Sequence, residues 1–193
     1  GVLTEIDRRT GEPVGRYDVM GGGKLVLRTP PEPVRDVEAA RALPVVTAGQ
    51  YLDEGYFRDV VPCIEEAHRR NLFVIGLCGS QTLNTMVAHL GDAERALLCF
   101  YDEPELARAL IDKGVERSIE RIRAFAEIGA DGIYIGDSYA SGSVLSPDMY
   151  RAFCVPAYRS AVREVHRLGM LCYKHCCGNY NPYLDDIADT GGS

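Results

Sequence analysis

The chain has 193 residues, of which 46% are hydrophobic and 25% charged, the balance of an ordinary globular protein. Its 28 acidic residues outnumber 21 basic ones, for a formal net charge of −7, so no nucleic-acid partner is expected, because phosphate binding needs a basic surface. No apolar run approaches the length of a membrane span and the first residues do not form a secretory signal, so no membrane association is expected.

The seven cysteines are odd in number and irregular in spacing, which does not fit a disulfide-stapled secreted protein. Most of them lie in apolar stretches, where a free cysteine packs as a small hydrophobic residue. The sequence therefore predicts a reducing, cytoplasmic location.

The first 44 residues are weakly patterned and are interpreted as an irregular N-terminal segment of a single domain over residues 1–193. Gly21-Gly22-Gly23 is interpreted as a flexible turn, because no strand and helix with the spacing of a phosphate-binding loop surround it. Residues 24–28 predict one short strand, and the prolines within 30–33 interrupt the chain after it.

From there the chain alternates amphipathic segments with short apolar runs, a pattern typical of helices and buried parallel strands. Strands are predicted over 72–77, 132–136 and 170–174, and helices over 59–71, around 86–87, and over 93–101, 104–128, 147–168 and 182–189.

Two of these helices carry clear start signals. Pro104 lies in the first turn of one of them. Ser146-Pro147-Asp148 begins the next with a capping serine, proline at the first helical position and an acid in the first turn. Pro156 predicts a kink within that second helix.

Strands that alternate with helices predict an α/β fold with a parallel sheet. Sites in such folds form at the carboxyl ends of the strands, which lie along one edge. Asp137 directly follows one predicted strand and His175 another. The sequence therefore predicts that both side chains project into one cavity at this edge.

The segment around His175 holds a candidate metal site. His175 and Cys177 offer an imidazole and a thiolate two residues apart, and zinc binds such nitrogen and sulfur ligands. A catalytic zinc takes three protein ligands, so this pair supplies only part of a site. Simple packing of both residues at a strand end remains the alternative.

Two further residues are candidates for the same cavity. Asp137 could orient a ligand or accept a proton, or its carboxylate could instead close a local turn with backbone amides. Cys78 follows the first predicted strand and could face the cavity, or it could be buried as a small hydrophobic residue.

Three motifs in this order resemble the uroporphyrinogen decarboxylase superfamily. The resemblance extends over about residues 72–191. The motifs are Gly129 to Ala140, then Leu145 to Tyr150 with Val155 to Tyr158, and last His175 to Asn179 with Asp185 to Gly191.

The resemblance implies a (β/α)8 barrel of the TIM type, of which this chain is a part, since a complete barrel takes about 250 residues. Within the superfamily, cofactor-free decarboxylases lack a His-x-Cys motif, whereas corrinoid-dependent methyltransferases carry one as zinc ligands, followed by a third cysteine far downstream. His175 and Cys177 match the first half of that zinc motif, and the chain ends before the position of the third cysteine.

The resemblance thus implies a zinc-dependent methyltransferase that moves a methyl group between a corrinoid, such as methylcobalamin, and a thiol or methoxylated substrate. It implies metal binding by His175 and Cys177 and a catalytic or orienting role for Asp137. Ser138, which matches a substrate-contacting serine, is a candidate substrate contact together with Tyr139 and Cys78. A separate corrinoid protein and a second copy of the chain are the expected macromolecular partners.

Two alternatives stay open at this point. The first is a cofactor-free decarboxylase of uroporphyrinogen-like tetrapyrrole acids, although the Arg-rich N-terminal segment of those enzymes has no counterpart here and Thr85 stands where they carry tyrosine. The second is a non-catalytic barrel fragment that pairs with another chain through its exposed sheet edges.

Overall fold

A computed structural model describes residues 2–6, 11, 13–19, 25–27, 32–137 and 139–191. The folded chain divides into two compact units, residues 1–34 and 35–193. The two units are distinguished by the contacts within each of them. That residues 1–193 form a single domain stays a prediction.

The N-terminal unit contains an antiparallel sheet in the order β1-β2-β3, formed by β1 (Val2–Ile6), β2 (Pro13–Val19) and β3 (Leu25–Leu27). The sequence pattern indicated only the last of these strands. The first two mix apolar with polar and charged residues, as antiparallel strands with one solvated face do, and their apolar signal is therefore weak. The glycine triplet at 21–23 lies outside the described residues.

The second unit holds a parallel sheet in the order β4-β5-β6 and the helices that connect its strands. The strands are β4 (Ile75–Cys78), β5 (Gly132–Gly136) and β6 (Leu171–His175). The helices are α1 (Val37–Arg41), α2 (Ala48–Asp53), α3 (Val61–Arg69), α4 (Leu83–Leu90), α5 (Ala93–Asp102), α6 (Pro104–Glu127), α7 (Pro147–Met149), the π-helical turn η2 (Tyr150–Cys154), α8 (Val155–Arg167), the 3-10 turn η3 (Asn181–Tyr183) and α9 (Leu184–Ala188). The predicted α/β fold with parallel strands is confirmed.

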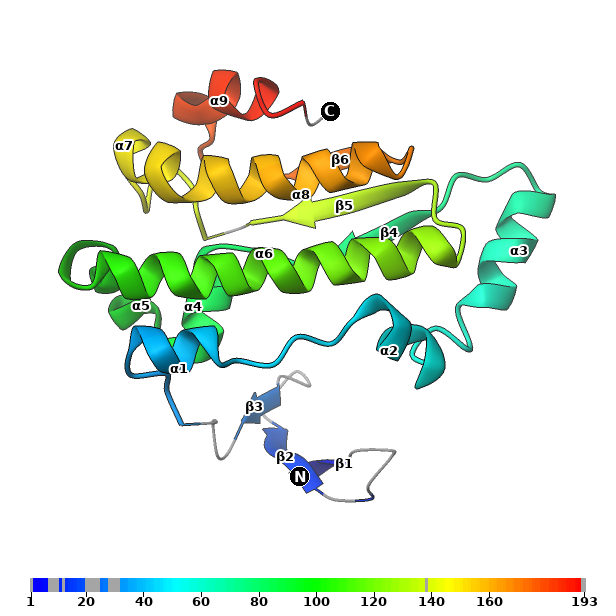
Figure 1. Cartoon of the computed structure of the whole chain (residues 1–193), viewed down its shortest axis with the longest axis horizontal. Coiled ribbons are helices and arrows are strands. Elements are labelled where there is room, and N and C mark those ends of the chain that lie inside the picture. The colour runs from blue at the N-terminus through cyan, green and yellow to red at the C-terminus, as the bar shows by residue number, and fades with distance from the viewer. Residues whose placement is uncertain are drawn as a thin grey trace. The chain divides into compact units, whose positions relative to one another are not determined.

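One face of the parallel sheet packs against α6 and α8, which lie side by side along it (Figure 1). Ile133, Ile135 and Cys172 project from this face into the core and are almost fully buried. The contact is close at Gly76, where a Cβ atom would lie 2.6 Å from the ring of Phe125 on α6. A side chain at Gly76 would therefore push α6 away from the sheet.

The opposite face of the sheet is open. Ile75 and Leu77 on β4 are 48% and 63% exposed, and Leu171 and Tyr173 on β6 are 61% and 53% exposed. The parallel strand predicted over 72–77 is present as β4, but it is displaced to Ile75–Cys78, and the expectation that it is fully buried is wrong. The strand begins at Ile75, after Asn71 has ended α3 in the left-handed conformation (φ 55°), and its side chains alternate between a covered and an uncovered face. In a closed barrel the inward faces of the strands pack against one another, so the open apolar face is the face that a partial barrel leaves uncovered.

The start signals predicted for the two helices are confirmed. The Ser146 side chain accepts a hydrogen bond from the backbone N of Met149 at 3.2 Å, and Pro147 is the first residue of α7. The predicted disturbance at Pro156 takes the form of the π-helical turn η2, which directly precedes α8. Because proline has no N–H to offer, the Ala152 carbonyl oxygen instead accepts a hydrogen bond of 3.4 Å from Nη1 of Arg108 on α6.

In the part of the chain that the structure describes, no helix has the length and apolar character required to cross a bilayer.

Gly114 lets α6 approach the loop that follows β4. A Cβ atom at this position would overlap the carbonyl oxygen of Gln81, a backbone atom that cannot turn away. In an ordinary helix interior, alanine stabilises by about 1 kcal/mol relative to glycine. We expect Gly114→Ala instead to lower the free energy of unfolding by about 1–3 kcal/mol, in the range of overpacked cores.

Gly49 provides the matched control for this substitution. It also lies in a helix, α2, but a Cβ atom there would meet only Thr47 Oγ1 at 4.0 Å. Gly49→Ala should therefore leave stability unchanged or raise it. Urea unfolding of both variants measures the difference, and equal effects would show that the Gln81 contact is unimportant.

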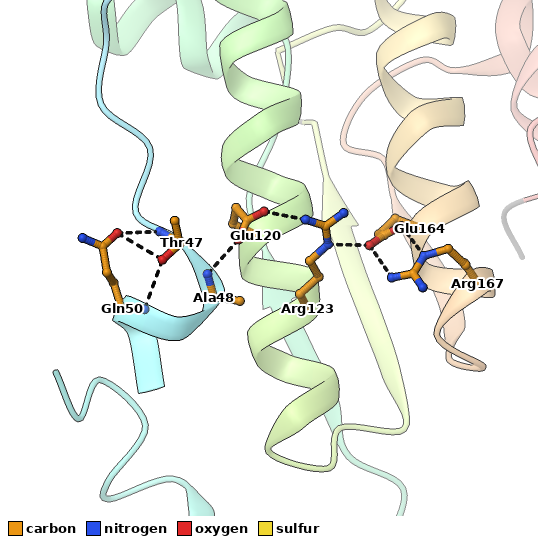
Figure 2. A network of polar contacts seen from close by, with 7 residues as sticks. All are labelled: Thr47, Ala48, Gln50, Glu120, Arg123, Glu164 and Arg167. Atoms are coloured by element: carbon orange, nitrogen blue, oxygen red, sulfur yellow. Dashed lines mark hydrogen bonds and ion pairs between the residues drawn. The ribbon is translucent and has the colours of Figure 1, made fainter. Parts of the chain in front are cut away.

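A chain of polar contacts ties α2, α6 and α8 together (Figure 2). Glu120 on α6 accepts a hydrogen bond from the backbone N of Ala48 at 2.8 Å and pairs with Arg123 at 2.6 Å. Arg123 Nε also donates to Glu164 on α8 at 2.7 Å, and Arg167 donates to both oxygens of the same carboxylate at 2.7 and 2.8 Å. Glu164, 9% exposed, is thus held between two guanidinium groups.

The two guanidinium groups make Glu164 a pH-sensitive contact. Hydrogen bonds from Arg167 and then Arg123 lower the pKa of Glu164 from 4.5 to about 2, although burial opposes this shift. A carboxylate with a lowered pKa in the folded state stabilises fully above its unfolded pKa, and this contribution is lost as the pH falls from about 5 toward 2.

We expect Glu164→Gln to lower the free energy of unfolding by about 1–3 kcal/mol at pH 7, because Arg167 loses its carboxylate partner and Arg123 keeps only Glu120. The deficit should shrink at pH 3, where the wild-type carboxylate takes up a proton on unfolding. Denaturant titrations at both pH values provide the test, with the exposed Glu65→Gln on α3 as control. If Glu164→Gln lowers the free energy of unfolding equally at pH 3 and pH 7, the lowered pKa of Glu164 in the folded state is contradicted.

Candidate functional site

His175 and Cys177 lie next to each other at the carboxyl end of β6. His175 is the last residue of the strand rather than the first residue after it, and its Nε2 atom lies 2.8 Å from the Cys177 sulfur. The turn that brings them together contains Gly178, whose φ of 93° disfavours a side chain and whose Cβ would lie 3.0 Å from Ser141. The two residues of the His-x-Cys motif therefore face each other.

The His175 ring belongs to the open face of the sheet. It stacks on Tyr134 of β5, with ring centroids 5.3 Å apart and planes inclined by 22°. Its register partner Gly136 leaves room for this stack, since a Cβ atom there would lie 3.1 Å from the Tyr134 ring. Lys174, one residue earlier, points to the covered face, where its Nζ lies 4.4 Å from the ring centroid of Tyr158 on α8.

Asp137 directly follows β5 and is buried, with 3% of its surface exposed. Its carboxylate accepts a hydrogen bond of 2.7 Å from Ser80 Oγ and a second one from Thr82 Oγ1. Its backbone carbonyl accepts a hydrogen bond from the Tyr180 hydroxyl, and its backbone N lies 3.4 Å from the carbonyl oxygen of His175. Asp137 thus connects the loop after β4 with the segment after β6.

The two neighbouring cysteines of the motif lie in different surroundings. Cys177 is exposed and contacts His175, whereas Cys176 is half-buried. Burial raises the pKa of the Cys176 thiol, the Lys174 ammonium opposes this, and the Asp137 carboxylate adds to it. Of the two sulfurs, that of Cys177 is therefore the one placed for ligation with His175.

Cys78 does not join these residues. It is the last residue of β4, on the covered face, and its thiol donates to the carbonyl oxygen of Ser118 on α6 at 3.7 Å. Ile135 is the register partner of both Cys78 and Lys174, so these side chains lie on the same, covered face of the sheet. Side chains alternate along a strand, and His175 therefore lies on the opposite face from Lys174 and Cys78. The expectation that Cys78 faces the same cavity as a substrate contact is corrected by this placement.

The remaining predicted substrate contacts flank Asp137. Tyr139 is 53% exposed at the start of the following loop, and Ser138 lies outside the described residues. Sequence reasoning missed Ser80 and Thr82, which bind the Asp137 carboxylate, and Tyr180. The sequence could have indicated Ser80 and Thr82 by their position in the loop after β4, because sites of parallel sheets form at the carboxyl ends of the strands.

The donor set at His175 and Cys177 fits part of a zinc site. An imidazole nitrogen and a sulfur that face each other are ligands zinc accepts, and a catalytic site needs a third. Within the described ranges, no group of three His, Cys, Asp or Glu side chains is arranged to hold a metal ion. The chain therefore offers two convergent ligands.

The sequence model of the family described as uroporphyrinogen decarboxylase (URO-D) matches residues 24–193. The chain belongs to the uroporphyrinogen decarboxylase family, which confirms the resemblance carried by its motifs.

Individual relatives fall into two groups. A uroporphyrinogen decarboxylase of Teredinibacter turnerae is 34% identical over 139 residues, which cover 70% of this chain and 38% of the relative. The methylcobamide:CoM methyltransferase MtaA of Methanosarcina barkeri is 34% identical over 87 residues, covering 45% of this chain and 25% of the relative. A methylated-thiol–coenzyme M methyltransferase of Methanosarcina mazei is 29% identical over 107 residues, which cover 55% of this chain and 28% of the relative.

The solved structure of a methyltransferase from Methanosarcina mazei is similar to this chain with a TM-score of 0.66 and 25% identity. The similarity covers 93% of this chain and 51% of that structure. The predicted partial barrel of the TIM type is thereby confirmed. The chain spans about 37–40% of the length of the decarboxylases it matches.

Proposed function

We propose that the protein acts as a zinc-dependent methyltransferase, which moves a methyl group between a corrinoid and a thiol or methoxylated substrate. The observation that carries the proposal is the contact between His175 Nε2 and Cys177 Sγ at the carboxyl end of β6. Relatives named for methylcobamide and coenzyme M support the same chemistry.

In this proposal His175 and Cys177 are zinc ligands, and a downstream cysteine of a complete barrel supplies the third. Bound zinc would lower the pKa of a substrate thiol, so that the thiol is held as a thiolate nucleophile. Tyr134 fixes the His175 ring by stacking, which leaves Nε2 directed toward Cys177. The open, apolar face beside these residues would exclude water from the reacting groups once a barrel encloses it.

Asp137 is proposed as an orienting residue of the site. Its carboxylate holds the 79–82 loop through Ser80 and Thr82, and its carbonyl fixes Tyr180 after β6. The exposed Tyr139 and its neighbour Ser138 are the proposed substrate contacts. A corrinoid protein, a second copy of the chain and a cytoplasmic location also remain proposals.

A decarboxylase of uroporphyrinogen-like acids is the second candidate. It is favoured by the longer alignments with decarboxylases, over 139 and 145 residues against 87 and 107 for the methyltransferases. Such an enzyme would make no use of a His–Cys ligand pair, so metal content separates the two candidates.

A non-catalytic chain that pairs with another chain is the third candidate. The open apolar face with Leu77 and Leu171 is the observation in its favour, because apolar faces of this kind pack in protein interfaces. The mass of the chain in solution tests pairing, and a monomer at micromolar concentration would contradict it.

The test of the proposed function uses a complete barrel that contains this chain. The protein, loaded with zinc, is mixed with methylcobalamin and coenzyme M, and loss of the methyl group is followed by the absorbance of the corrinoid. We expect demethylation that disappears in the His175→Ala variant. Decarboxylation of uroporphyrinogen without any demethylation would instead support the second candidate.

A further inference from the structure

A second pocket lies on the covered side of the sheet, at the carboxyl end of β4. Its volume is about 180 Å3, and its wall includes Tyr51 of α2, Ser80 of the following loop, and Arg117, Ser118 and Arg121 of α6. The sheet separates it from His175 and Cys177, since the β4 residue that lines it, Cys78, faces α6. The pocket is therefore distinct from the proposed metal site.

Two arginines one helical turn apart supply the positive charge of this pocket. Neither Arg117 nor Arg121 forms an ion pair with a carboxylate among the residues that the structure describes, unlike Arg123 on the same helix. The chain as a whole carries a net charge of −7, so acids are abundant elsewhere. Like charges four residues apart destabilise a helix slightly, and a bound anion would relieve this repulsion.

Arg117 is held in place by neutral acceptors. Its Nε and Nη2 donate to the carbonyl oxygen of Pro44 at 3.3 and 3.2 Å, and its Nη1 contacts His89 Nε2. Burial, and then Arg117, lower the pKa of His89, so the ring is a neutral acceptor at pH 7. These contacts occupy three of the five N–H groups of the guanidinium, which leaves two for a ligand.

Arg121 adds further donors, and Ser118 lies beside it in the pocket wall. The guanidinium of Arg121 lies 5.9 Å from the ring centroid of Tyr51, and no hydrogen bond within the described ranges occupies its N–H groups. Ser118 also lines the pocket and is only 7% exposed, and its side chain is a hydrogen-bond partner of Cys78. Burial raises the pKa of the Cys78 thiol to about 11, so this wall of the pocket is neutral and does not repel an anion.

We propose that this pocket binds one small oxyanion, a phosphate or carboxylate group, between Arg117 and Arg121. The forked donors of arginine match the oxygens of both groups. A volume of about 180 Å3 admits one such group rather than a nucleotide. Ser80 lines the pocket and also binds Asp137, so an occupied pocket would stiffen the loop that holds Asp137.

The test titrates the chain with inorganic phosphate and, separately, with acetate, at pH 7.5 and constant ionic strength maintained with potassium chloride. Binding is read by isothermal calorimetry and by the midpoint of thermal unfolding. We expect saturable binding of one anion per chain, with a dissociation constant below about 1 mM for at least one of the two anions. Tighter binding of phosphate identifies a phosphate group as the ligand, and tighter binding of acetate a carboxylate group.

Arg121→Gln should weaken this binding at least tenfold, and Ser118→Ala should weaken it less. Arg159→Gln on α8 removes the same charge from an exposed position outside the pocket and should leave the affinity unchanged. Equal weakening by Arg121→Gln and Arg159→Gln, or no binding beyond that of chloride, would overturn the proposal. Neither result would affect the proposed methyl transfer, which rests on the other face of the sheet.

Discussion

Replacing Cys177 with serine, in a complete barrel that contains this chain, should lower the affinity for zinc by at least about 100-fold. Residues that merely support metal ligands contribute about 10- to 100-fold, and loss of a thiolate ligand should exceed that. The reason lies in the geometry at β6, where the Cys177 sulfur is the one that contacts His175 Nε2. Competition with a chromophoric chelator measures the affinity.

Cys176→Ser is the matched control for this substitution, since the two cysteines are neighbours in sequence. Cys176 is half-buried and its thiol has a raised pKa because of that burial, so its loss should change the zinc affinity by less than about threefold. His175→Ala should reproduce the effect of Cys177→Ser. If zinc is lost with Cys176→Ser and retained with Cys177→Ser, the assignment of the sulfur ligand is wrong.

Replacing Asp137 with alanine should lower the free energy of unfolding by about 2–4 kcal/mol. The substitution removes the acceptor of two hydroxyl donors, the half-buried Ser80 and the buried Thr82, and a buried group left unsatisfied costs about 1–3 kcal/mol. Asp137→Asn keeps one side-chain oxygen as acceptor and should cost less. Denaturant unfolding measures both variants, with Asp53→Ala, an exposed aspartate at the end of α2, as control.

A double-mutant cycle separates this anchoring role from a general loss of packing. If Asp137 stabilises the loop through Thr82, then Thr82→Val should cost less in the Asp137→Ala background than in the wild type. Strictly additive effects of the two substitutions would show that the carboxylate and the hydroxyl are not coupled. In that case Asp137 would not act on the 79–82 loop.

Features determined by neighbouring residues were predicted well from the sequence. The start of α7 follows from Ser146 and Pro147, and β5 occupies the predicted residues 132–136. The His175–Cys177 contact also arises between residues two positions apart on one strand end. Each of these depends on local backbone geometry, which the residue types themselves indicate.

Features that depend on distant residues were not predictable in the same way. The late start of β4 coincides with a hydrogen bond of 2.7 Å from the backbone N of Val74 to Asp131, 57 positions away. The hydroxyls that bind Asp137 come from a loop 55 and 57 positions away. The buried stripe of α6 includes Gly114 and Ser118, which carry no hydrophobic signal and are buried because they lie against the β4 strand and loop. Likewise, the exposure of Leu77 depends on whether other elements pack on that face of the sheet, and the residues of β4 alone do not predict this.

The most direct test of the proposed metal site is X-ray absorption at the zinc edge, on a complete barrel that contains this chain. The proposal predicts one zinc per chain with nitrogen neighbours at about 2.0–2.1 Å and sulfur neighbours at about 2.3 Å. One sulfur neighbour should disappear in Cys177→Ser and persist in Cys176→Ser. A barrel with intact His175 and Cys177 that holds no zinc, or holds it through oxygen and nitrogen alone, would contradict the proposal and favour the decarboxylase.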